Sequence, residues 1–187
     1  MKGAVPILLL AMPFTLNAAA QERPVLNSFS WSCGMGPPAT VAEWWQRADL
    51  IVRVRIDSQF AYADQQTLDP VVTAHEATVS EVIKAHPRAV GVGASQTILQ
   101  FGGTLDNGRE IIVHSANGFQ ILPVGSEWLL FLRWDKYVEG FTPVTFAHGA
   151  FQIIDGKLVT PNATVFEKTW HARSANALIR ALERERR

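Results

Sequence analysis

The most continuously hydrophobic segment outside the N-terminus lies within residues 124–134. It has strand length and is rich in aromatic residues, and Gly125 precedes it as a turn signal. Because successive strand residues face opposite sides, the even-numbered residues from Trp128 to Trp134 share one face and Leu129 and Phe131 share the other. Both faces are apolar. We therefore predict the central strand of a small barrel, with a helix or loop covering its outer side.

Alternation of apolar and polar residues predicts the other strands. Leu50, Val52, Val54 and Ile56 alternate with charged residues in residues 49–56, which indicates a strand with one solvated face. Residues 71–84 form a second strand, in which adjacent Val82 and Ile83 indicate a bulge. Further strands are predicted at 96–105, 109–115, 141–146, 150–154 and 157–160, with hairpin turns at Asp106-Asn107-Gly108 and Asp155-Gly156.

Helical periodicity appears at both ends of this β-rich region. Thr40 and Glu43 have the spacing of a capping box, which predicts a short helix over Thr40–Ala48. An apolar stripe and terminal arginines predict a second helix over Ser174–Arg186, and the polar segment Gln59–Pro70 is predicted to be a loop. The fold class is therefore mainly β: a small OB-like Greek-key barrel of about five or six strands, with a short N-terminal helix and a C-terminal helix.

The N-terminus has the pattern of a secretory signal peptide. Lys2 precedes an apolar segment, and Ala18-Ala19-Ala20 supplies the small residues that signal peptidase recognises. A membrane anchor is the alternative, but the apolar run is short for a span of about 20 residues. We predict a signal peptide over 1–20, a flexible and irregular segment over 21–32, and one domain over 33–187. The mature protein is then secreted or periplasmic, with no membrane span.

Charge and cysteine content narrow the possible partners. The 17 basic and 17 acidic residues balance, whereas nucleic-acid-binding domains usually carry a clustered basic surface, so no nucleic acid is expected. Cys33 is the single cysteine. No intramolecular disulfide can form, and in an oxidising compartment Cys33 is either a free thiol or links two copies in a dimer.

Candidate catalytic and metal-binding residues are few. None of the five histidines has the spacing of a zinc pair, and His75-Glu76 lacks the second histidine of His-Glu-x-x-His because Val79 occupies that position. Cys33 with a histidine could form a hydrolase site, but an ordinary loop thiol is the favoured interpretation. Trp44 and Trp45 are interpreted as core rather than as a stacking surface for a ligand. We predict no catalytic residue, no metal and no cofactor.

The segment Cys33-Gly34-Met35-Gly36-Pro37-Pro38, followed by Asp49-Leu50-Ile51-Val52, resembles the start of the tissue inhibitors of metalloproteinases. Those inhibitors and the netrin C-terminal modules share an OB-like barrel with flanking helices. The resemblance covers roughly residues 33–161. It departs from the family in its cysteines, since Met35 stands where the second cysteine would be and no later cysteine follows.

The resemblance implies that Cys33–Pro38 and Gln59–Pro70 contact a partner. We therefore predict a non-enzymatic exported module that binds a protein or another envelope component. The resemblance also implies an alternative, a metalloprotease inhibitor in which the free amino group and the carbonyl of Cys33 chelate the protease zinc. That mechanism requires Cys33 to be the mature N-terminus. The hydrolase using Cys33 and a histidine is the third hypothesis.

Overall fold

The computed structural model of the protein describes residues 23–30, 36–63, 71–116, 121–145, 148–160 and 164–187. This part of the chain is mainly β, with ten strands and three helices. The strands are β1 (Val25–Ser30), β2 (Leu50–Tyr62), β3 (Val72–Lys84), β4 (Ser95–Phe101), β5 (Gly103–Asp106), β6 (Ile111–Ala116), β7 (Glu127–Asp135), β8 (Gly140–Pro143), β9 (Ala150–Ile154) and β10 (Lys157–Val159). The helices are α1 (Val41–Arg47), α2 (Val165–Trp170) and α3 (Ala175–Arg184).

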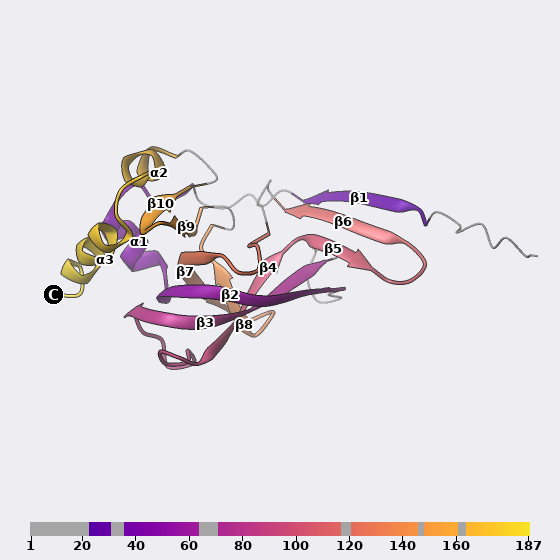
Figure 1. Cartoon of the computed structure of the whole chain (residues 1–187), viewed down its shortest axis with the longest axis horizontal. Helices are drawn as coiled ribbons and strands as arrows, with labels where there is room; N and C mark the ends of the chain where they lie inside the picture. Colours follow the sequence, from indigo (N-terminus) through magenta and orange to yellow (C-terminus); the bar gives the residue numbers. More distant parts are fainter. Residues whose placement is uncertain (1–22, 31–35, 64–70, 117–120, 146–147, 161–163) are drawn as a thin grey trace, which may run out of the picture.

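The strands form two sheets. The larger has seven strands in the order β10-β9-β7-β2-β3-β4-β8, and β8 also pairs with β7. All its neighbours are antiparallel except β4 and β8, which are parallel at Ile98 and Phe141. The smaller sheet has the order β1-β6-β5. Figure 1 shows the three helices gathered beside β9 and β10, with the smaller sheet at the opposite end of the molecule.

Strand β7 is the central strand that its hydrophobic pattern predicts. Trp128, Leu130 and Leu132 belong to an apolar cluster, here called the strand core, whose members come mostly from β2, β3 and β7. Leu129 and Phe131 belong to a second cluster, here called the helix core, together with buried residues of all three helices. Both faces of β7 are therefore covered, as predicted.

The helix core is built around Trp44 of α1, which has no solvent exposure. Its ring centroid lies 4.8 Å from that of Phe131 and 5.7 Å from that of Phe166 in α2. Helix α3 adds the predicted stripe of Ala175, Leu178, Ile179 and Leu182. Packing of aromatic rings on β7 thus fixes where the helices lie against the larger sheet.

The N-terminus of α1 differs in one bond from the predicted capping box. The Thr40 hydroxyl accepts from the Glu43 amide as expected, but the Glu43 carboxylate accepts from the Ala39 amide instead of that of Thr40. A full capping box occurs in α2, which was not predicted: Thr164 and Glu167 each accept from the other's amide.

Both predicted hairpins are present. Asp155 and Gly156 have φ values of 50° and 73° between β9 and β10, the left-handed conformation that a two-residue type I′ turn requires. The connection between β5 and β6 is longer than the predicted turn, since it spans 107–110 and the Asn107 amide donates to the Glu110 carbonyl. The strand predicted over 96–105 is interrupted at Gly102, where φ is 100°, and continues as β5 in the other sheet. The predicted bulge beside Val82 is confirmed by a register shift.

Several predicted boundaries are wrong, including the end of the strand predicted over 141–146, which lies at Pro143. Residues Val25–Ser30, predicted to be irregular, form β1 in parallel pairing with β6. Strand β2 continues to Tyr62, although Gln59 and the residues after it were predicted to be a loop. Helix α3 ends at Arg184 instead of Arg186. The described part of the chain contains ten strands, because β1 was not predicted and the strand predicted over 96–105 is divided into β4 and β5. Pairing with other strands extends the β structure into segments in which apolar and polar residues are mixed.

Candidate binding surface

The described part of the predicted Cys33–Pro38 contact segment lies beside α1. Gly36 is exposed, and its carbonyl accepts a hydrogen bond of 2.7 Å from the Arg47 guanidinium. Pro38 is buried. These contacts attach the two-proline segment to the end of α1. Cys33, Gly34 and Met35 lie outside the described residues, and nothing in the described structure supports a Cys33-linked dimer.

The described part of Gln59–Pro70 lies at the distal end of the β2–β3 ribbon, where Phe60 pairs in register with Ala74. Phe60 is 56% exposed, and its ring centroid lies 6.0 Å from that of half-buried Tyr62. Residues 64–70 lie outside the described residues. A large aromatic side chain with more than half its surface in water, backed by a second ring, is the kind of group that anchors protein–protein contacts.

An apolar cluster lies beside this ribbon end and supports it. It comprises Val72 and Ala74 of β3 and Leu99 and Phe101 of β4, with Tyr62 packed against them. Tyr62 therefore connects exposed Phe60 to the buried body of the sheet. We call Phe60 and Tyr62 together the ribbon tip.

The two predicted contact segments are not brought together. Gly36 lies beside α1, which leads into the start of β2, whereas Phe60 and Tyr62 lie at the other end of the same strand. The 13 residues of β2 correspond to on the order of 40 Å of extended chain. The described residues of the two segments thus belong to separate surfaces at opposite ends of β2 (Figure 1).

Comparison with known proteins gives no family. No family model matches the chain, and no curated protein matches it. The resemblance to the metalloproteinase inhibitors therefore stays a prediction.

The interior of the larger sheet contains one buried histidine. His75 has no exposure, and its Nε2 lies 3.0 Å from the Gln100 side-chain oxygen. That oxygen also accepts from the Leu122 amide, which can only donate, so His75 must carry its proton on Nε2. His75 Nδ1 is then an acceptor, and it is buried without a hydrogen-bond partner in the described structure. Burial lowers the pKa of His75 to about 4, although the bond to Gln100 acts in the opposite direction.

Sequence reasoning considered His75 only as part of an incomplete metalloprotease motif and did not predict its burial, although the pattern contains the signal. Thr73 and His75 precede Ala77 and Val79 at two-residue spacing, which places all four on one face of β3. All four are buried. The two polar residues form hydrogen bonds inside the protein: Thr73 donates to the Gly102 carbonyl, and His75 bonds to the Gln100 side chain.

Charged side chains on the outer face of the larger sheet bond one another. Arg53 donates to Glu127 over 2.7 Å, and this bond is the main reason that the pKa of Arg53 is raised. Asp57 accepts from the hydroxyl and the amide of Thr78, and the Thr78 hydroxyl is the main cause of its lowered pKa. These pairs bridge neighbouring strands, so their first role is to fix strand pairing.

The other candidate ligands are dispersed. His148 Nδ1 lies 3.2 Å from the Glu167 carboxylate, at hydrogen-bond distance, and Glu167 is a buried residue of the α2 capping box. His86 stacks on Trp134 with ring centroids 6.2 Å apart. Among the described residues, no three histidine, cysteine or acidic side chains are grouped so that they could hold a metal ion. Within the same residues, no helix has the length and hydrophobicity needed to cross a bilayer.

Proposed function

We propose that this chain is an exported, non-enzymatic binding module built on an OB-like barrel. The barrel is supported by the cycle of strand pairing, in which β7 pairs with β2, β2 with β3, β3 with β4, β4 with β8, and β8 again with β7. The strand core lies on one face of this cycle, and the parallel contact of β4 with β8 is compatible with Greek-key connectivity. Export follows from the predicted signal peptide.

The ribbon tip carries the proposed binding function. Phe60 projects into solvent from paired strands, so its backbone is held in place before a partner arrives. Preorganised aromatic anchors lose little conformational entropy on binding. A protein or another envelope component with an apolar pocket would cover Phe60 and Tyr62. The Cys33–Pro38 segment would form a separate contact.

The non-enzymatic assignment is supported by how the polar side chains are used. Arg53 with Glu127, Asp57 with Thr78, and Glu76 with Ser95 and Thr97 tie neighbouring strands together. These groups act within the fold as cross-strand pairs, and their arrangement gives no reason to assign them a catalytic role.

Replacing Phe60 with serine should abolish specific capture of the partner without unfolding the protein. The mature protein would be immobilised and exposed to envelope extract, and each captured species would be quantified for wild type, Phe60→Ser and Tyr137→Ser. Tyr137 is a matched control because it is aromatic, is 68% exposed and is not part of the ribbon tip. We expect roughly a tenfold or greater loss for Phe60→Ser, as aromatic anchors often contribute about 2 kcal/mol or more. Equal capture by all three proteins would contradict this assignment of the surface.

Metalloprotease inhibition is the second candidate function. The bond from Arg47 to the Gly36 carbonyl and the burial of Pro38 favour it, because they fix the chain just after the proposed chelating residue. Bidentate chelation needs a free α-amino group beside a carbonyl, which only the first residue of a mature chain has.

The mature N-terminus separates the two candidates. We expect the exported protein to begin at or near Gln21, which would leave the Cys33 nitrogen in a peptide bond. Intact-mass spectrometry of protein recovered from the periplasm or medium measures this directly. A chain beginning at Cys33 would instead make zinc-protease inhibition the leading function.

A further inference from the structure

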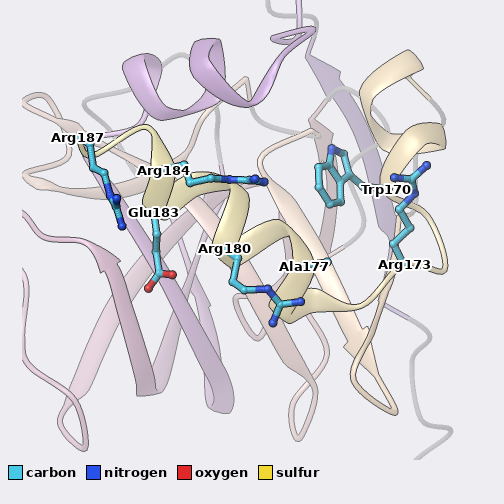
Figure 2. Close-up of a pocket in the computed structure, with 7 residues that line it drawn as sticks. All are labelled: Trp170, Arg173, Ala177, Arg180, Glu183, Arg184 and Arg187. Atoms are coloured by element: carbon cyan, nitrogen blue, oxygen red, sulfur yellow. The ribbon is translucent and has the colours of Figure 1, made fainter.

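A basic groove of about 500 Å³ lies where α2 and its following turn meet α3. Arg180, Arg184 and Arg187 line it along α3 and its C-terminal extension, while Trp170 and Arg173 line it from the end of α2 and the following turn. Figure 2 shows Arg184 reaching from α3 toward the Trp170 ring. The volume of the groove lies within the range of about 300–1,000 Å³ typical of small-ligand sites.

The amphipathic pattern of α3 explains why the arginines face outward. Leu178, Ile179 and Leu182 are buried in the helix core. Arg180 and Arg184 are four residues apart and exposed, so they lie together on the opposite, solvated face. The guanidinium groups therefore gather on one side of a helix whose apolar face is already used.

The positive charge of the groove is not neutralised within the described structure. None of its four arginines forms an ion pair with a described carboxylate. Arg173 instead lies over the Trp170 ring, 5.6 Å from its centroid. Glu183 is the one acidic side chain in the lining, so four guanidinium groups and one side-chain carboxylate leave a net side-chain charge of +3.

We propose that this groove binds a compact soluble anion that carries two or more phosphate groups. A phosphate monoester carries a charge of about −1.5 to −2 at neutral pH, so two such groups match the net charge of the groove. Each guanidinium group can also donate two parallel hydrogen bonds to two oxygens of one phosphate. The Trp170 ring forms a flat wall beside the arginines. A carboxylate carries only one negative charge, so a ligand built from carboxylates would have to be larger than one built from phosphates to reach the same total charge.

The concave shape favours a ligand that enters the groove over a membrane surface that lies across it. Insertion into a bilayer would require an exposed apolar helix face, whereas the apolar face of α3 is buried. None of the groove residues belongs to the ribbon tip or to Cys33–Pro38. The proposal is therefore independent of the binding function proposed above, and either can fail without the other.

The test is isothermal titration calorimetry of the mature protein with tripolyphosphate as the probe. Arg180→Gln with Arg184→Gln should weaken binding at least roughly tenfold, because charge-assisted hydrogen bonds are lost. Arg109→Gln with Arg133→Gln removes the same charge from exposed sites outside the groove and should change affinity by less than about threefold. Glu183→Gln should tighten binding by about twofold to fivefold, since one repulsive carboxylate is removed.

Three results would overturn the proposal: no binding of tripolyphosphate, equal weakening by the two double variants, or arginine-dependent binding only to phosphatidylglycerol vesicles. Arg180 and Arg184 are both exposed, so the variant with both arginines replaced by glutamine should have the same melting temperature as the wild type. If it does not, the Arg180→Lys and Arg184→Lys pair retains the charge and should retain measurable affinity. Loss of tripolyphosphate binding in a folded lysine pair would contradict the site.

Discussion

Replacing Phe131 with alanine should lower the free energy of unfolding by about 3–5 kcal/mol, a large part of the stability of an ordinary domain. Phe131 has no solvent exposure, and its ring contacts the Trp44 and Phe151 rings with centroids 4.8 Å and 5.6 Å away. Truncation removes these contacts and leaves a cavity that the surrounding strands and helices can fill only in part. Urea denaturation of the mature protein gives the value.

Val92→Ala is the control for this measurement. Val92 is 65% exposed, and truncation of an exposed side chain usually changes stability by less than about 0.5 kcal/mol. If Phe131→Ala were as mild as Val92→Ala, the helices would not depend on β7 for their packing. The two-sided role of β7 would then be wrong.

The stability of the protein should fall by up to about 3 kcal/mol between pH 6.5 and pH 4 because of His75 alone. In the folded state burial lowers its pKa to about 4, while in the unfolded chain the pKa returns to about 6.5. The unfolded state therefore binds a proton at a higher pH than the folded state. Stability is full above pH 6.5 and is lost as the pH falls toward 4.

His75→Gln measures this contribution, because glutamine can donate to the Gln100 oxygen but does not titrate. We expect the unfolding free energy of the variant to depend less steeply on pH than that of the wild type over this interval. Asp57 and Asp106 have lowered pKa values and are present in both proteins, so their effect at lower pH cancels in the difference. Denaturant unfolding at several pH values provides the comparison.

Thr73→Val is the matched control, since Thr73 is buried on the same face of β3 and has no titratable group. Its substitution should change stability by a similar amount at every pH in the interval. A His75→Gln profile parallel to that of the wild type would show that His75 protonates as readily in the folded protein as in the unfolded chain.

The candidate binding surface could be predicted only in part. The resemblance nominated Gly36, Pro37 and Pro38, and it nominated the segment that includes Phe60. It did not indicate that Phe60 lies on a paired strand, although Phe60 and Tyr62 are aromatic residues at two-residue spacing, because the segment as a whole is mostly polar. Pairing with β3 holds them extended. Arg184 and Arg187 were interpreted only as favourable charges at a helix C-terminus, because Trp170 and Arg173 approach them from a helix that was not predicted and the turn that follows it.

Local pattern by itself determined β7, the Asp155-Gly156 turn and the buried stripe of α3. In each case the signal lies within a few adjacent residues: apolar residues on both faces of a strand, two residues that adopt positive φ, or a 3.6-residue repeat. These preferences act whatever the rest of the chain does, so the sequence alone is sufficient to locate them.

Only the tertiary structure decided where distant segments meet. Val25–Ser30 pairs with Ile111–Ala116 across more than 80 residues, and β8 reaches β4 through the single pair Ile98 and Phe141. Backbone groups pair in the same way whatever side chains they carry, so no local signal states which strand will be the neighbour. The burial of His75 and the gathering of arginines around Trp170 follow from those pairings and from helix packing.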